Sequence, residues 1–340
     1  MVNQESKFPI DIVYTWVDQS EPVWVEERQK TFYRVHKKQN LCRDGIRERE
    51  FEKLHQLKYS LRSVSRYADF VNKIYIVTDH QVPTWINLAH PKIELVSHQT
   101  VFKDTGKLPS FNSHAIESRL HHIPGLSEHF LYLNEDFFFG SRVSPADFFI
   151  NSKVSKFFPS PNRIESSPVS PADLGMTAAA KQGQKLMKKH FNQKIVHYIS
   201  HCPYPLQRSI LYEMETVFKA EFNRTASHQF RHINDISIPA FLYFYYAAEK
   251  GRAIPSLLKY MYLDKKLDHF IRKMIFSLFT KKYQFFCING GYTASMADTL
   301  NHKILAAFLD FSFPEKCEFE GDSQQFSVNL ELIQNKSHFH

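Results

Sequence analysis

Short runs of apolar residues recur through the first 140 positions and predict a buried sheet. The runs have strand length, end in polar or turn-forming residues, and lie at 10–17, 73–78, 93–97 and 130–133. Between them, helices are predicted from apolar spacing and start signals at 57–66, 82–88 and 111–120. This alternation of strands and helices predicts a Rossmann-like α/β unit over about the first 150 residues.

The pattern changes in the second half of the chain. Residues 160–180 are rich in Ser, Pro and Ala and predict a linker or substrate loop. From 181 the chain reads as helical and basic, and amphipathic helices are predicted at 207–218 and 239–249. Residues 257–286 alternate cationic and apolar positions, which is compatible with a face lying on a membrane surface.

These patterns divide the chain into four parts. The charged segment 31–51 lacks clean periodicity and is expected to be a loop or an exposed helix within the first part. The expected parts are a Rossmann-like nucleotide-sugar-binding part at 1–155 and a linker with a basic helical insertion at 156–200. A helical part completing the site is expected at 201–325, and a tail at 326–340.

Composition narrows the function. With 340 residues, 43% of them hydrophobic, the chain can bury a sizeable core, and only 10 Gly leave no long glycine-rich phosphate loop. The formal net charge of +8 suits an anionic substrate, an anionic membrane surface or nucleic acid. The sequence has neither a signal-peptide core nor a long apolar span, so a cytosolic protein is expected. The four scattered cysteines are expected to be free thiols: Cys42, Cys202, Cys287 and Cys317.

The apolar run at 130–133 ends in candidate chemistry. Asn134, Glu135 and Asp136 follow it directly. In open α/β sheets, ligands bind outside the carboxyl ends of the strands, and buried carboxylates are costly unless a cation pairs with them. The acids therefore suggest metal and phosphate chemistry, although such a pair taken alone favours a surface turn after a core strand.

Four blocks of motifs occur in a fixed order along the chain. The first is DIVYTWVD at 11–18, and the second runs from LKYSLRS at 57–63 through LPSFNSHAIE at 108–117 to YLNED at 132–136. The third comprises HCPYPLQR, SHQFRH and YFYY, at 201–208, 227–232 and 243–246, and the fourth comprises FCING and FPEKCEF, at 286–290 and 313–319. Together they resemble the Stealth family, which includes capsule polysaccharide hexose-1-phosphate transferases and the N-acetylglucosamine-1-phosphotransferase that tags lysosomal enzymes.

The resemblance implies a reaction and a fold. The fold would be a GT-A-like nucleotide-sugar-binding core with a mainly helical C-terminal portion. A hexose-1-phosphate, expected to be N-acetylhexosamine-1-phosphate, would pass from a UDP-sugar to a glycan hydroxyl, releasing UMP and forming phosphodiester linkages in a capsular or other cell-surface polysaccharide. The expected cofactor is Mg²⁺ or Mn²⁺, and the expected location is the cytoplasm, with peripheral association at an anionic membrane and no nucleic-acid partner.

The resemblance also assigns residues to the reacting phosphate. The expected catalytic residues are Asp136, His228, Arg208, Arg231 and His201. Asp136 is expected to hold the metal or to act as base, with Glu135 as a second metal ligand. The family usually has Asn-Asp-Asp where this chain has Asn-Glu-Asp, which leaves the second acid intact.

The basic residues have roles of their own in this scheme. Arg208 and Arg231 would present planar forks to phosphate oxygens, and a surface salt bridge is the alternative for each. His228 is expected to be the base and His201 a phosphate or acceptor ligand, whereas His232 is expected to be structural.

Substrate binding is expected at the ends of predicted strands and at the start of a predicted helix. The residues expected there are Tyr14, Thr15, Trp16, Val17, Asp18, Arg62, Ser63, Asn112, Ser113, Glu117 and Asn134. Core packing competes for Trp16, a solvated helix face for Arg62, and a helix N-cap for Asn112.

Two other functions remain open from sequence. A GT-A glycosyltransferase would use the same donor and metal but release UDP. A nonenzymatic module binding polyanions or a membrane surface would explain the basic charge, although it leaves the ordered motifs unexplained.

Overall fold

The protein is described here from a computed structural model covering residues 8–36, 40–45, 55–263, 283–288 and 296–321. Its centre is a five-stranded sheet in the order β10-β4-β1-β2-β3. The four parallel strands are β1 (Ile10–Thr15), β2 (Val71–Thr78), β3 (Ile93–Ser97) and β4 (His129–Asn134). Strand β10 (Tyr204–Gln207) pairs antiparallel with β4 at the edge. This arrangement confirms the predicted α/β class and its Rossmann-like sheet.

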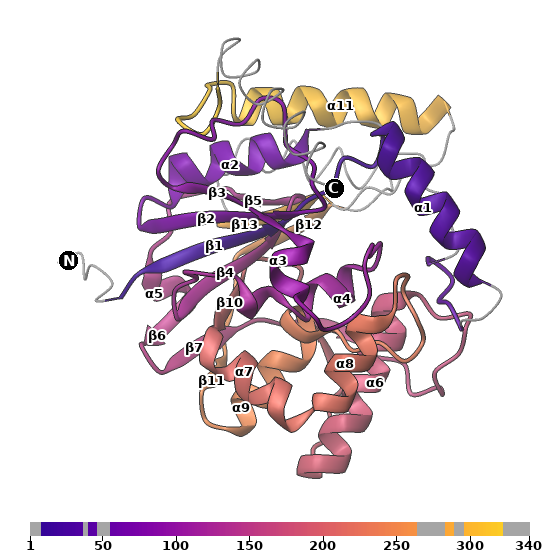
Figure 1. Ribbon diagram of the computed structural model, residues 1–340. Coiled ribbons are helices and arrows are strands. Elements are labelled where there is room, and N and C mark those ends of the chain that lie inside the picture. Colours follow the sequence, from indigo (N-terminus) through magenta and orange to yellow (C-terminus); the bar gives the residue numbers. More distant parts are fainter. Residues whose placement is uncertain (1–7, 37–39, 46–54, 264–282, 289–295, 322–340) are drawn as a thin grey trace.

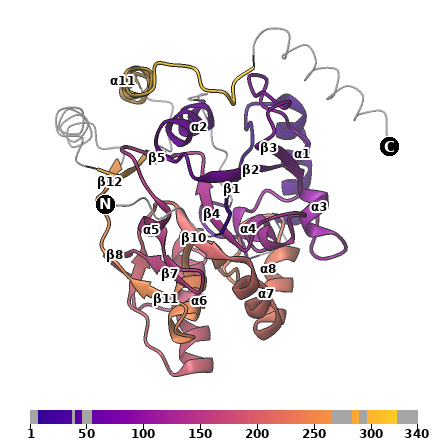
Figure 2. The ribbon, with the colours of Figure 1, turned by 90° about the vertical axis from the view of Figure 1, so that its left-hand side faces the viewer.

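Helices cover both faces of the central sheet (Figure 1). One face carries α2 (Gln56–Tyr67) and α11 (Met296–Ser312). The opposite side, seen again in Figure 2, carries α6 (Gly175–Phe191), α7 (Arg208–Val217), α8 (Lys219–Ser227) and α9 (Tyr243–Glu249). The described residues of the second half are therefore mainly helical, as expected.

Smaller elements complete the fold. Three further sheets are β12-β13-β5, β11-β7-β6 and β8-β9. Their strands are β5 (Phe137–Phe139), β6 (Phe149–Asn151), β7 (Val154–Phe157), β8 (Pro159–Arg163), β9 (His197–Ile199), β11 (Ala253–Pro255), β12 (Tyr260–Leu263) and β13 (Phe285–Ile288). The remaining helices are α1 (Pro22–Val35), α3 (His98–Phe102), α4 (Ser113–Glu117), α5 (Pro145–Phe148), η2 (Leu120–His122) and η3 (Ile238–Leu242).

The central strands are buried on both faces, which explains their continuous apolar runs. Ile12 and Val13 point to opposite faces of β1, and both are fully buried. The hydroxyl of Tyr14 lies 2.7 Å from the Ser60 hydroxyl and so links β1 to α2. These contacts fix the strand whose carboxyl end borders the candidate site.

Several predicted elements differ in the structure. The helix predicted at 82–88 is wrong, because this segment is irregular and its buried Ile86 forms an isolated bridge with Glu320. The loop predicted at 160–180 contains the end of β8 and the start of α6. The helix predicted at 111–120 is shorter, and the strands and helices expected elsewhere in the first 140 residues are confirmed.

Fewer predictions can be compared with the structure in the second half of the chain. Helices at 207–218 and 239–249 are confirmed by α7 and by η3 followed by α9. Much of the expected membrane-surface segment and the whole expected tail lie outside the described residues. The four-part division stays a prediction, although β10 adds an edge strand from the third part to the sheet of the first. Among the described residues, no helix combines the length and apolarity needed to cross a bilayer.

Candidate functional site

The carboxyl ends of β1 and β4 lie side by side in the central sheet. Thr15 and Asn134 are paired in register at these ends, where the strand order changes direction. The Tyr132 hydroxyl lies 3.0 Å from Thr15 Oγ1, 2.8 Å from Asn134 Oδ1 and 3.2 Å from Glu117 Oε1. This is the crevice in which doubly wound sheets bind ligands, and four polar groups converge there.

Glu117 enters this crevice from the end of α4. Its side chain is only 7% exposed, and its Oε2 atom has no hydrogen-bond partner among the described residues. Burial raises the pKa of Glu117, whereas the positive charges of His114 and Arg231 and a hydrogen bond to Tyr132 lower it. An orphaned buried oxygen of this kind is suited to accept a hydrogen bond from a ligand hydroxyl.

Asp136 lies in the turn between β4 and β5. The Cys287 thiol donates to Asp136 Oδ2 at 3.4 Å, and His201 Nε2 lies 4.0 Å from the same oxygen. Its Oδ1 atom has no partner within the described chain. Burial, together with the negative charge of Glu135, raises the pKa of Asp136 to about 7. Such a carboxyl gains most from a cation brought close to it.

Asp136, His201 and Cys287 offer ligand atoms that all lie within 4.8 Å of one another. The carboxylate oxygen without a partner fits a hard divalent cation, which prefers oxygen ligands. Asp136 is therefore the residue around which a metal would be held.

His201 is fixed against this acid by aromatic neighbours. Its Nδ1 lies 3.0 Å from the Tyr204 hydroxyl, and its ring packs edge-on against Phe137 at 4.7 Å. Burial, reinforced by the charge of Arg231, lowers the pKa of His201 to about 4. The imidazole is consequently neutral near pH 7.

Arg231 is held on the other side of the site. Its guanidinium binds Asp44 Oδ2 at 2.5 Å and Ser113 Oγ at 2.8 Å. Asp44 also accepts from the backbone N–H of Gly175 at 2.7 Å, and a Cβ at Gly175 would approach Arg231 Cδ to 2.7 Å. Ion pairing therefore sets the direction of the Arg231 fork, and the glycine makes room for its stem.

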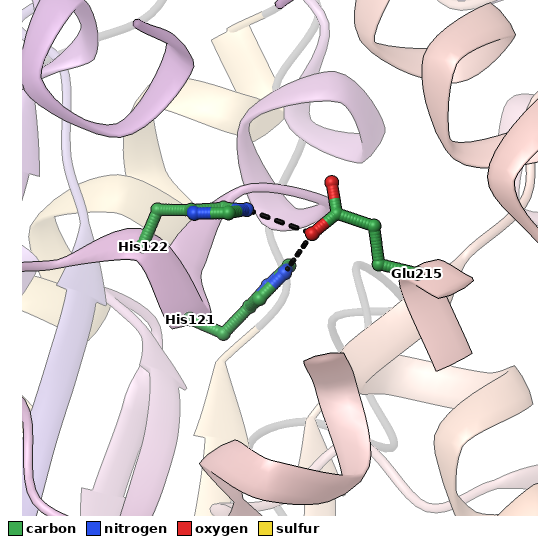
Figure 3. A group of neighbouring side chains, drawn as sticks. All are labelled: His121, His122 and Glu215. Atoms are coloured by element: carbon green, nitrogen blue, oxygen red, sulfur yellow. Dashed lines mark hydrogen bonds and ion pairs between the residues drawn. The ribbon is translucent and has the colours of Figure 1, made fainter. Parts of the chain in front are cut away.

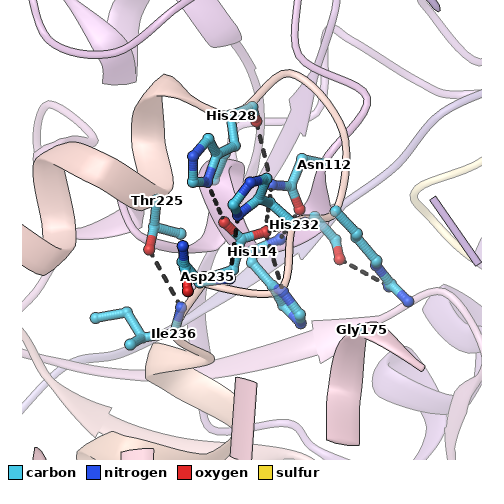
Figure 4. A network of polar contacts seen from close by, with 12 residues as sticks. Asn112, His114, Gly175, Thr225, His228, His232, Asp235 and Ile236 are labelled. Carbon is cyan, nitrogen blue, oxygen red and sulfur yellow. Dashed lines mark hydrogen bonds and ion pairs between the residues drawn. The ribbon is translucent and has the colours of Figure 1, made fainter. Parts of the chain in front are cut away.

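A buried carboxylate organises the loop that carries Arg231 (Figure 4). Asp235 Oδ1 lies 2.6 Å from His228 Nδ1, while Asp235 Oδ2 accepts from the Asn112 amide at 2.8 Å and from the His232 backbone N–H at 2.9 Å. Burial would raise the pKa of Asp235, but the nearby His114, 3.7 Å away, and the hydrogen-bonded His228 bring it down to about 2. The His228 and His232 rings stack 4.0 Å apart.

Other predicted site residues make contacts within the fold. Arg208 donates to the backbone carbonyls of His121, Leu126 and Ile123 at 2.8, 3.0 and 3.2 Å. Arg62 forms a two-pronged pair with Glu320 at 2.6 and 2.9 Å. These guanidinium groups stabilise tertiary structure in this conformation.

The remaining predicted residues support the walls of the crevice. Ser63 Oγ accepts from the backbone N–H of Phe139 at 3.1 Å, and the side chain of Asn112 caps α4. Trp16 is half-buried against the core, and its backbone N–H donates to the Val77 backbone carbonyl. The carboxylate of Asp18 accepts from Ser20 in the turn after β1. Burial raises the pKa of Glu135. Val17 is half-buried beside them.

Sequence reasoning did not single out several residues that shape this site. Tyr132 lies within a recognised motif and could have been found there. Cys287 reaches Asp136 only because β13 pairs with β5. Asp44 and Asp235 act through partners far away in sequence, at Arg231 and Asn112 respectively.

Comparisons with known proteins match three regions of this chain. Residues 8–31, 50–157 and 200–249 match the family models of Stealth protein conserved regions 1, 2 and 3. An exopolysaccharide phosphotransferase of Streptomyces coelicolor is 40% identical over 93% of this chain, which covers 53% of that protein. The exopolysaccharide phosphotransferase CpsY of Mycobacterium tuberculosis is 37% identical over 92% of this chain and 58% of its own length. The chain thus spans a little over half the length of these relatives.

Solved structures include glycosyltransferases of similar arrangement. The galactosyltransferase LgtC, in complex with donor and acceptor sugar analogues, has a TM-score of 0.43 and 9% identity, covering 91% of this chain and 98% of that one. The bifunctional glycosyltransferase WbbM has a TM-score of 0.42 and 12% identity, covering 90% of this chain and 50% of that one.

Proposed function

Because the chain belongs to the Stealth protein family, we propose that it is a sugar-phosphate transferase acting on a UDP-sugar and a glycan hydroxyl. The observation that carries the proposal is the meeting of four side chains at one end of the sheet. Glu117 and Asp136 come from the second matched region, and His201 and Arg231 come from the third. The names of the relatives, exopolysaccharide phosphotransferases, support a polysaccharide acceptor.

The proposed reaction is a displacement at phosphorus. The acceptor hydroxyl attacks the phosphorus that carries the sugar, a new P–O bond forms, and the bond to the bridging diphosphate oxygen breaks. UMP leaves with that oxygen, and the hydroxyl proton passes to a base. The sugar keeps its anomeric oxygen, so the product is a phosphodiester of N-acetylhexosamine or a related hexose.

Arg231 is the proposed phosphate ligand. Its fork presents several N–H donors in one plane, which matches two oxygens of a phosphoryl group. Asp44 and Ser113 hold the guanidinium in place before the substrate arrives. Preorganised donors of this kind stabilise the charge that develops in the transition state.

We assign His201 to the substrate as a phosphate or acceptor ligand. Its Nε2 lies 4.0 Å from Asp136, and the Tyr204 contact at Nδ1 orients the ring so that Nε2 faces the site. His228 is the proposed base, as expected from sequence. Its Nδ1 lies 2.6 Å from Asp235 Oδ1, and a carboxylate in this position orients an imidazole for proton transfer.

Asp136 is the proposed ligand of Mg²⁺ or Mn²⁺, through the oxygen that has no partner in the described chain. A bound cation would neutralise diphosphate charge. Glu117 and Asn134 are the proposed ligands of sugar or ribose hydroxyls, and their shared contact with the Tyr132 hydroxyl, which also reaches Thr15, supports this.

The test is to incubate the purified protein with Mg²⁺, a panel of UDP-sugars and short glycan primers, and to separate UMP from UDP. We expect UMP, with phosphorus retained in the glycan, and loss of this product in Asp136→Ala but not in the exposed control Glu26→Ala. UDP as product would instead establish a glycosyltransferase. Full UMP release by Asp136→Ala would refute the assigned site.

A further inference from the structure

A second cluster of metal-ligand side chains joins η2 to α7. The Nε2 atoms of His121 and His122 each lie 2.8 Å from Oε2 of Glu215 (Figure 3). The proposed transfer reaction uses none of these three residues. Two consecutive residues thus aim their imidazoles at a single carboxylate oxygen, 93 positions away in sequence from the nearer of them.

The surroundings hold all three side chains in place. Arg119 binds the other oxygen of Glu215 and leaves Oε2 to the imidazoles. The Tyr212 ring packs edge-on against both histidines, with centroids 4.7 and 5.2 Å away. Arg208 binds the backbone carbonyl of His121. These contacts fix the positions of the rings, whereas Nδ1 of His121 is buried with no hydrogen-bond partner among the described residues.

The chemistry of this cluster differs from that of the other histidine group, around Asp235. The Asp235 oxygens accept from the Asn112 amide and the His232 backbone N–H as well as from His228, and amide nitrogens of this kind are poor metal ligands. Oε2 of Glu215 accepts from two imidazole nitrogens, and both of these can ligate a metal. A cation entering this cluster would replace two hydrogen bonds with three coordination bonds.

We propose that His121, His122 and Glu215 form a binding site for a divalent cation of the zinc type. Their ligand atoms all lie within 4.8 Å of one another, and two imidazoles with one carboxylate make up a ligand set that zinc uses in proteins. His122 and Glu215 are 14% and 20% exposed, so water can reach a fourth position. Each neutral imidazole moves its proton from Nε2 to Nδ1 on binding. The bound metal links η2 to α7. Element η2 directly follows α4, the helix that carries Glu117.

The test is zinc binding to the full chain after chelator treatment and dialysis, measured by calorimetry, metal analysis and thermal unfolding. We expect zinc to bind and to raise the Tm of the native chain. His122→Ala, which removes a partly exposed ligand, is expected to weaken binding at least tenfold and to abolish the rise in Tm. The exposed His190→Ala is the matched control and should bind as the native chain does.

Two further variants separate this site from folding defects and from the candidate active site. Glu215→Gln keeps the side-chain shape and should also bind zinc at least tenfold more weakly than the native chain. This variant provides the test if circular dichroism shows that His122→Ala does not fold. Asp136→Asn should retain zinc binding at this cluster. The proposal is overturned if the native chain binds no zinc, if His122→Ala and Glu215→Gln bind it undiminished, or if Asp136→Asn alone abolishes binding.

Discussion

Replacing Asp136 by Asn should remove activity and yet stabilise the metal-free protein at pH 8. The pKa of Asp136 rises from its ordinary value of 3.8 to about 7, because the carboxyl is buried and faces Glu135. A rise of about 3 pKa units corresponds to about 4 kcal/mol. The side chain is 16% exposed, and water reaching it lowers the expected cost of the charge to roughly 2 kcal/mol.

The sign follows from proton binding. The folded state binds the Asp136 proton more tightly than the unfolded state, so this carboxyl costs nothing below about pH 4, where both states are protonated. Its cost grows as the pH rises from about 4 to about 7 and is then constant. Asn has no proton to lose, and it can still accept from the Cys287 thiol. The free energy of unfolding of Asp136→Asn should therefore exceed that of the native chain by an amount that increases with pH.

The assay is urea unfolding of both proteins from pH 4 to pH 9 with a chelator present, repeated with saturating Mg²⁺. Without metal, Asp136→Asn should be the more stable protein at pH 8 and equal to the native chain near pH 4. Mg²⁺ should narrow the gap by stabilising only the native chain. A gap that is absent at pH 8, or that does not change with pH, would refute the link between burial, charge and metal at this carboxyl.

Three other substitutions test different parts of the structure. Arg231→Lys should lower kcat for UMP release about 100-fold with little change in Tm, because the lysine cannot present two donors in one plane. Arg62→Ala should cost about 3–5 kcal/mol in urea unfolding, since it leaves Glu320 buried without its strongest partner, and an unchanged stability would contradict this. Gly106→Ala should destabilise more than Gly251→Ala: both glycines have positive φ, at 91° and 66°, but only at Gly106 would a Cβ lie 2.7 Å from a backbone carbonyl oxygen.

Local pattern was sufficient to predict the central sheet. The strand at 73–78 is an almost continuous apolar run with its last five residues buried, and the strand at 93–97 is a shorter apolar run at the sheet edge that includes the half-buried Glu94. No distant contact is needed to recognise either of them. The segment 82–88 has a similar apolar content, yet its Ile86 is buried against the C-terminal segment through a pairing with Glu320. The apolar residues of 82–88 are buried by a segment distant in sequence, although their spacing resembles that of a helix. Local periodicity cannot distinguish these two causes of apolar spacing.

The candidate site was predictable in its acids and less so in its basic residues. Glu135 and Asp136 follow a strand directly, so position along the chain was enough to place them. From sequence, Arg62, Arg208 and Arg231 are similarly good candidates for binding a phosphate, because each lies in a recognised motif. The fold gives all three internal acceptors, and what distinguishes Arg231 is its place in the site, where its charge lowers the pKa of His201 and opposes the rise in the pKa of Glu117.

The loop that carries Arg231 is fixed by contacts that lie outside the reaction itself. The Asn112 amide binds Asp235 and also lies 3.1 and 3.3 Å from the backbone carbonyls of His228 and Phe230. The backbone carbonyl of Arg231 accepts from the Cys42 N–H at 2.9 Å. A guanidinium held by so many bonds at its base loses little freedom when phosphate binds, so more of the interaction is available to the transition state. In the proposed reaction, the network around Asp235 would therefore act by fixing Arg231, and its contacts join Asn112 of the second matched region to His228 and His232 of the third.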